Sequence, residues 1–219
     1  MLETLNNLDT RVFLWINHHH CVVADWVLWV SSQAWSWAVV LLAFFCLVTL
    51  RREPRNWWIV VLGVALCFLF SDRVSVLCFK EVVCRLRPCH VLDDVRMFRT
   101  HCGGQYGFVS SHAANVFALA MFLSLRYGGR KKQVDGVVAE SNMAKQRVWI
   151  VPALAFLWAF VVIYSRPYLG KHYPGDCICG AIVGVALGSL VFFLLERISF
   201  TRSSRPKKQK DEKPEEKTA

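Results

Sequence analysis

Long apolar stretches separated by short charged connections dominate the chain. The five stretches cover residues 34–50, 57–79, 113–125, 148–165 and 177–195. The first, fourth and fifth carry no charged residue over 17, 18 and 19 positions, and the second is interrupted only by Asp72 and Arg73. A helix that crosses a bilayer needs about 20 mainly apolar residues, with a range of roughly 17–25. The pattern therefore predicts five membrane-spanning helices rather than the buried helices of a soluble core.

The first thirty residues show a different, amphipathic pattern. Apolar side chains recur at helical spacing at Leu5, Leu8, Val12, Trp15 and Ile16. Asp9 and Arg11 fall on the other side of such a helix, and the histidine run at 18–20 then interrupts it. This favours a helix that lies in the membrane interface, with a sixth crossing left open. We therefore predict an all-α integral membrane protein, a helical bundle of five to six transmembrane helices with an interfacial N-terminal helix.

Composition agrees with this picture and adds an orientation. Hydrophobic residues make up 55% of the chain and charged residues only 19%, which excludes intrinsic disorder for most of its length. The formal net charge is +10, and 17 of the 26 Lys and Arg residues fall in residues 51–55, 126–147 and 197–217. Lys and Arg near helix ends stay on the cytoplasmic side. The positive charge therefore indicates membrane orientation rather than nucleic-acid binding.

The chain divides into two parts in this interpretation. Residues 1–198 form one membrane-embedded domain. Residues 199–219 are rich in Lys, Glu and Pro, and we expect them to form a disordered basic cytoplasmic tail. Ionisable residues gather in three clusters on the opposite side of the membrane. Because ionisable groups at membrane depth are costly, these clusters are candidates for function.

The first cluster is Lys80-x6-Arg87-Pro88. Lys80 and Arg87 are seven positions apart, so a helix through both would place them on one face. Pro88 cannot continue a regular helix, which puts Arg87 near the helix end. Two cations on one face can bind a doubly charged anion such as phosphate. A basic pair that snorkels to the interface is the alternative.

The second cluster is Ser110-Ser111-His112, at the start of the apolar stretch at 113–125. Ser110 is a favoured N-cap residue, and the backbone amides at a helix start form an anion site. His112 falls in the first helical turn and faces the same connections. An isolated histidine at a helix start is usually structural, but its position beside the basic cluster favours catalysis.

The third cluster joins Arg166, His172 and Asp176. Pro174 and Gly175 predict a turn, after which Asp176 caps the last long helix and accepts a hydrogen bond from His172. A carboxylate on one imidazole nitrogen fixes the tautomer and makes the other nitrogen a better nucleophile. Together the clusters suit phosphoryl transfer through a covalent phosphohistidine, with no metal required.

These residues resemble the type 2 phosphatidic acid phosphatase family of integral membrane lipid phosphatases. The family signature has three parts: Lys-x6-Arg-Pro, Pro-Ser-Gly-His and Ser-Arg-x5-His-x3-Asp. The first and third parts match at Lys80, Arg87, Pro88, Ser165, Arg166, His172 and Asp176. The second part matches at Ser110 and His112, with Val109 in place of Pro and Ser111 in place of Gly. The resemblance covers residues 57–198.

The resemblance implies a role for each site residue. His172 would be the nucleophile, Asp176 its orienting partner, and His112 the general acid that protonates the leaving group. The phosphoryl oxygens would be held by Lys80, Arg87, Ser110, Arg166 and the backbone amide of Ser111. No cofactor and no metal ion are implied.

The resemblance also implies a lipid phosphatase whose site opens at the periplasmic face of a bacterial inner membrane. Its partners would be the bilayer and a lipid phosphate, with no nucleic acid. A lipid A 4'- or 1-phosphatase is favoured because extra cations suit a multiply charged saccharolipid. These cations are Arg85, Arg96, Arg99 and Lys171. An undecaprenyl diphosphate or phosphatidylglycerol phosphate phosphatase is the alternative, and a non-catalytic lipid-phosphate binder or transporter and a vanadate haloperoxidase are less favoured.

Nine cysteines complete the inventory. Cys84, Cys89 and Cys102 fall on the oxidising side in this topology, which leaves open one disulfide among them. A zinc site built on Cys177 and Cys179 together with His101 and Cys102 is disfavoured by the C-x-C spacing of the first two.

Overall fold

The computed structural model describes residues 2–128 and 142–203. Its elements are α1 (Leu2–His18), α2 (Val22–Ser31), α3 (Ala34–Phe44), η1 (Phe45–Thr49), α4 (Leu50–Arg52), α5 (Trp57–Val74), η2 (Ser75–Lys80), α6 (Glu81–Val83), α7 (Pro88–Val91), α8 (Ser111–Gly128), α9 (Asn142–Tyr168) and α10 (Pro174–Ser203). The π-helical segments η1 and η2 continue the helices before them, so α3–α4 and α5–α6 each form one rod. The described ranges contain no β-strand, which confirms the all-α class.

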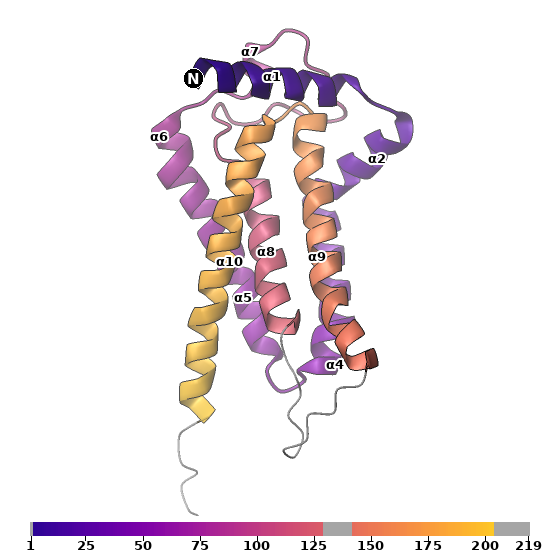
Figure 1. Cartoon of the computed structure of the whole chain (residues 1–219), viewed down its shortest axis with the longest axis vertical. Coiled ribbons are helices and arrows are strands. Elements are labelled where there is room, and N and C mark those ends of the chain that lie inside the picture. The colour runs from indigo at the N-terminus through magenta and orange to yellow at the C-terminus, as the bar shows by residue number, and fades with distance from the viewer. Residues whose placement is uncertain (1, 129–141, 204–219) are drawn as a thin grey trace, which may run out of the picture.

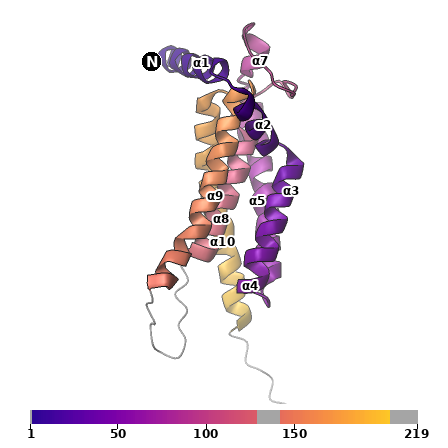
Figure 2. The same ribbon diagram turned by 90° about the vertical axis from the view of Figure 1, so that its right-hand side faces the viewer.

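The long helices run side by side as a bundle (Figure 1 and Figure 2). Four segments are long and apolar enough to cross a membrane, Ala34–Arg52, Trp57–Val83, Trp149–Tyr168 and Pro174–Arg197. The 18-residue α8 is the fifth long helix of the described bundle and covers the predicted apolar stretch at residues 113–125, although it is not among the four apolar segments. α1 lies across one end of the bundle (Figure 1). With 10 residues, α2 spans about 15 Å, half of a hydrocarbon core of about 30 Å. Neither α1 nor α2 therefore makes the sixth crossing that the sequence left open.

A stripe of small residues lets α10 approach α8 closely. Gly180, Gly184 and Gly188 recur every four positions and so share one face of α10. A Cβ atom on Gly184 or Gly188 would lie 2.3 Å from a backbone carbonyl oxygen of α8, that of Ala114 or Ala118. Because no larger side chain fits between the two backbones, the stripe fixes how the middle of α10 packs against the N-terminal half of α8.

Arg126 holds the helices together at the end of the bundle away from α1. Its guanidinium is 2% exposed and pairs with Glu53, before α5, and with Glu196 in α10. The sequence counts Arg126 among the cations that set topology, and the structure buries it in an ion-pair network. The end of this basic connection, from Asn142, belongs to α9, and its residues 129–141 lie outside the described residues. So does the tail from residue 204, while α10 continues to Ser203.

α1, α2 and the connection at residues 84–110 cover the other end of the bundle, and we call them the cap layer (Figure 1). Arg96 of this connection pairs with both carboxylate oxygens of Asp25 in α2, at 2.7 and 2.8 Å. The Tyr168 hydroxyl, at the end of α9, donates to the same carboxylate at 2.7 Å. The Asn17 side chain of α1 donates to the backbone carbonyl oxygens of Arg96 and Tyr168 at 3.0 and 2.9 Å. These contacts hold the cap layer on the bundle.

Candidate active site

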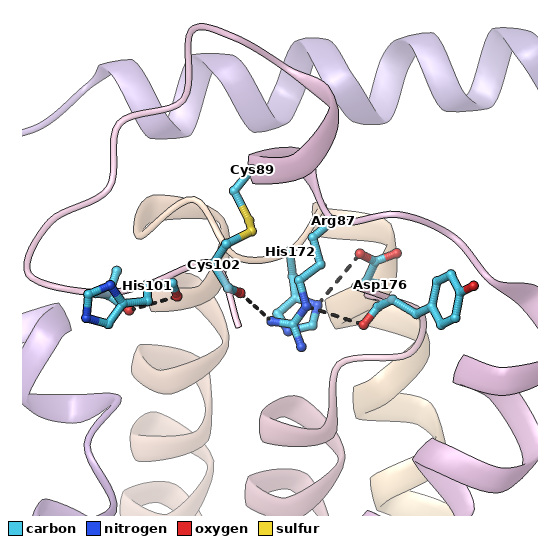
Figure 3. Close-up of a disulfide and its surroundings, with 8 residues drawn as sticks. Arg87, Cys89, His101, Cys102, His172 and Asp176 are labelled. Atoms are coloured by element: carbon cyan, nitrogen blue, oxygen red, sulfur yellow. Dashed lines mark hydrogen bonds and ion pairs between the residues drawn. A yellow bond between two sulfur atoms is a disulfide. The ribbon is translucent and has the colours of Figure 1, made fainter. Parts of the chain in front are cut away.

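The three predicted clusters meet beneath the cap layer. Their residues come from η2, the connection that follows α6, and the ends of α8, α9 and α10. The most enclosed of them are Ser110, Arg166, His172 and Asp176, none more than 2% exposed. Figure 3 shows Arg87 reaching toward His172 and Asp176, although it lies far from both in the sequence.

Arg87 enters the site by a different route from the one predicted. α6 ends before Cys84, which takes a left-handed backbone conformation with φ 51°. Lys80 and Arg87 therefore do not share a helix face, because the chain turns between them. Arg87 lies in extended conformation at the N-cap of α7. Its guanidinium donates to the carbonyl oxygens of Tyr106 and Cys102, each at 3.3 Å (Figure 3).

A disulfide between Cys89 and Cys102 closes the connection beside Arg87 (Figure 3). It is formed by two of the three cysteines that the sequence placed on the oxidising side, and Cys84 is an exposed free thiol. Cys89, His90 and Cys102 also bring possible metal-ligand atoms within 4.8 Å of one another. The disulfide consumes both thiolates that a metal would need, so these residues do not fit a metal site.

The start of α8 brings the second cluster against the first and third. α8 begins at Ser111, so Ser110 takes the predicted N-cap position. The Ser110 backbone N–H donates to the carbonyl oxygen of Asp176 at 3.1 Å. Lys80 Nζ donates to the Ser111 hydroxyl at 2.7 Å. The hydroxyl that replaces the family's glycine thus holds a cation at the N-terminus of α8, where an anion is favoured.

The predicted hydrogen bond between His172 and Asp176 is not formed. His172 Nδ1 lies 3.8 Å from Asp176 Oδ2, beyond hydrogen-bond range. Asp176 Oδ1 accepts from Arg85 Nη1 at 2.7 Å, and Oδ2 accepts from the backbone N–H of Tyr173 at 3.1 Å. Local spacing could not show this, because Arg85 lies 91 positions before Asp176.

Three buried polar atoms of the clusters have no hydrogen-bond partner among the described residues. They are Ser110 Oγ, Arg166 Nε and His172 Nδ1. Buried polar groups without partners are rare and costly. Two of the three, on Ser110 and Arg166, are donors that an oxyanion would satisfy, so the arrangement is suited to a phosphoryl group.

Burial and the neighbouring cations control the protonation of the site. Burial, together with the charges of Arg166, Arg87 and Lys80, lowers the pKa of His172 well below its usual range. The imidazole is therefore neutral at neutral pH, as a nucleophile requires. Burial and the charges of Arg166 and Arg87 also lower the pKa of Lys171, to about 8. Lys171 thus lies close to the proposed phosphate ligands and not only on the outer surface.

The other cations that the sequence analysis expected to bind the substrate have partners within the protein. Arg85 and Arg96 pair with carboxylates inside the protein, and Arg99 lies over the Trp26 ring at 4.7 Å. Asp9, a partner of Arg85, is a site residue that sequence reasoning missed. The signal for it was weak, an acidic residue on the polar side of the amphipathic N-terminal helix, which also carries Glu3.

Comparisons with known proteins find several phosphatases that are similar to this chain. The model of the PAP2 superfamily matches residues 56–199. A lipid A 4'-phosphatase from Bacteroides thetaiotaomicron is 32% identical over 211 residues, covering 91% of this chain and 82% of the relative. A lipid A 4'-phosphatase from Porphyromonas gingivalis is 28% identical, covering 94% and 81%. Among solved structures, a PAP2 type phosphatidylglycerolphosphate phosphatase from Bacillus subtilis is similar with a TM-score of 0.61 at 16% identity, covering 92% of this chain and 88% of that one.

Proposed function

This chain belongs to the PAP2 superfamily, and on that premise we propose that it removes a phosphate from lipid A through a phosphohistidine at His172. The observation that carries the proposal is a buried, neutral imidazole among cations, beside two unpartnered donors on Ser110 and Arg166. Such a site binds a phosphoryl group and offers it a nucleophile. Lipid A as the substrate is supported by the two relatives that carry this activity in their names.

In the proposed reaction, His172 attacks phosphorus and the bond to the lipid oxygen breaks. His112 protonates that oxygen as it leaves and then takes a proton from the water that attacks the phosphohistidine, which frees phosphate and restores both imidazoles. The phosphoryl oxygens are held by Lys80, Arg87, Ser110, Arg166 and the backbone amide of Ser111. Asp176 orients the imidazole, since a contact of 3.8 Å can tighten into a hydrogen bond when substrate binds.

An apolar cavity supports a substrate with acyl chains. Its volume is about 710 Å³, and it lies between α3, α4, α8 and α9. Val116, Ala120 and Leu123 line it, and they continue the face of α8 that begins at His112. Trp37, also in the lining, packs edge-on against His112 with ring centroids 5.5 Å apart. Because His112 serves the leaving oxygen, the lipid part of the substrate lies on this side, next to the apolar lining.

We also propose that the site faces the periplasm of a bacterial inner membrane. Arg51 and Arg52 end α4 at the opposite end of the bundle, and such residues stay in the cytoplasm. The Cys89–Cys102 disulfide lies at the site end, and disulfides persist in the oxidising periplasm. The exposed thiol of Cys84 tests this orientation. A membrane-impermeant maleimide should label it in intact spheroplasts, and labelling only after lysis would reverse the assignment.

The activity itself is tested with purified protein in detergent micelles. We expect phosphate release from lipid A in the presence of a chelator, and faster than from undecaprenyl diphosphate or phosphatidylglycerol phosphate. His172→Ala should abolish turnover and the acid-labile ³²P label that a brief incubation leaves on the protein. Turnover of His172→Ala at the wild-type rate would refute the mechanism. A faster reaction with phosphatidylglycerol phosphate would show that this lipid, and not lipid A, is the preferred substrate.

A further inference from the structure

Arg85 joins the carboxylate beside the nucleophile to the N-terminal helix. Its Nη1 donates to Asp176 Oδ1 at 2.7 Å, and its Nη2 donates to Asp9 Oδ2 at 2.8 Å and to Asn6 Oδ1 at 2.9 Å. The guanidinium also lies over the Tyr173 ring, 4.1 Å from its centroid. One side chain thus connects α1 to both residues that flank the turn into α10.

Asp9 makes the second half of this connection. Its Oδ1 accepts the backbone N–H of Gly175 at 2.8 Å. A Cβ atom on Gly175 would lie 2.8 Å from Asp9 Oδ2, so a larger residue there would displace the Asp9 carboxylate. The side chains of Asp9 and Arg85 are 15% and 22% exposed. Water therefore screens their ion pair less than it would at the surface, and α1 is held firmly against the start of α10.

The backbone of Arg85 supports the same region. Its carbonyl oxygen accepts the N–H of Gly107 at 2.8 Å. Gly107 lies against the catalytic pair, because a Cβ atom there would be 3.1 Å from Asp176 Oδ2 and 3.6 Å from His172 Nδ1. Arg85 therefore sets the position of the wall behind the imidazole as well as that of the carboxylate.

We propose that Arg85 is a positioning residue for the nucleophile, and that α1, through Asp9, belongs to the active-site scaffold. The inference rests on the proposed roles of His172 and Asp176. Arg85 occupies Asp176 Oδ1 and so keeps the carboxylate from rotating, which leaves Oδ2 facing His172 Nδ1. Arg85 does not bind the phosphate, because two carboxylates already neutralise its charge. Although burial opposes the charged form, Asp176 and Asp9 raise the pKa of Arg85 above its usual value.

The test compares Arg85 with Arg96, which ties the cap layer to an N-terminal helix through the same kind of ion pair. Arg85→Met and Asp9→Asn should lower kcat with little change in KM, Arg85→Met by about 10- to 100-fold. Arg85→Lys should restore part of kcat, because lysine keeps the charge but cannot bridge two carboxylates. Arg96→Met should lower the Tm by a similar amount and leave kcat within about twofold, since the Arg96 side chain pairs with Asp25 and not with a described residue of the site.

An activity-independent measurement accompanies the kinetics. Hydrogen–deuterium exchange of residues 172–178 should be faster in Arg85→Met than in Arg96→Met, whatever the substrate. Equal exchange in the two variants, or kcat values that fall in parallel with Tm, would overturn the positioning role. A rise in KM at constant kcat would instead make Arg85 a substrate ligand and also contradict it. A wild-type protein inactive on every lipid phosphate would refute the proposed function alone, because the exchange result stands apart from turnover.

Discussion

Removing the Cys89–Cys102 disulfide should weaken catalysis by releasing Arg87. The disulfide closes the connection that carries Arg87 at one end and, at the other, the Cys102 carbonyl oxygen that accepts from Arg87 Nη1 at 3.3 Å. In the variant with both Cys89→Ala and Cys102→Ala, the connection gains conformational freedom. Arg87 must then be ordered again each time a phosphoryl group binds.

The size of the effect follows from the length of the closed loop. Cys89 and Cys102 are separated by 13 positions. The conformational free energy lost on closing a loop of this length is about 3 kcal/mol. If the binding of substrate had to provide all of this free energy, kcat/KM would fall by about 100-fold. If only the hydrogen bond to Arg87 were lost, about 1 kcal/mol, the fall would be about fivefold. We therefore expect kcat/KM to fall between about fivefold and 100-fold.

The assay measures phosphate release by the double alanine variant and by wild-type protein with and without a reductant. Cys84→Ala is the matched control, because Cys84 is an exposed free thiol of the same connection. It should keep wild-type kcat/KM and the same sensitivity to reductant. Adding Arg87→Lys should cost less in the double alanine variant than in wild type, since both changes act on one contact. Wild-type kcat/KM in the double alanine variant, or full additivity with Arg87→Lys, would refute the reasoning.

Three further predictions follow from protonation and from the apolar cavity. The pKa of His172 is well below its usual value, so below about pH 6.5 the unfolded chain binds a proton that the folded chain does not. As the pH falls from 7 to 5, the free energy of unfolding should therefore decrease by up to about 1.4 kcal/mol per pH unit. Thermal unfolding should show this decrease in wild type and a smaller one in His172→Gln. The pKa of Lys171 is about 8, so Lys171 loses its positive charge above that pH. KM should therefore rise above pH 8 in wild type and stay constant in Lys171→Met. The same dependence of KM on pH in both proteins would exclude Lys171 from phosphate binding. Leu154 lines the cavity, so Leu154→Trp should slow hydrolysis of a long-chain lipid phosphate and leave hydrolysis of a short-chain one unchanged. Leu157 is equally exposed on α9, at 60%, and Leu157→Trp should leave both rates unchanged. Equal effects of the two variants would show that the cavity does not bind the substrate.

Two corrections share one physical cause. Lys80 and Arg87 were expected on one helix face, but the chain turns at Cys84. His172 and Asp176 were expected to share a hydrogen bond, but Arg85 and a backbone amide occupy the carboxylate. In each case the prediction extended a local periodicity or spacing. A contact from a distant part of the chain, or a break in the helix, decided the geometry instead.

The sequence by itself determined the class of the protein and the residues of its signature. Apolar stretches of bilayer length favour spanning helices wherever they occur, because a backbone in lipid must satisfy its own hydrogen bonds. Only the tertiary structure decided which cysteines pair, that Arg126 is buried between two carboxylates, and that Arg85 and Asp9 belong with the nucleophile. These are contacts between residues far apart in the chain, and they depend on how the helices and the cap layer pack, which no local pattern contains.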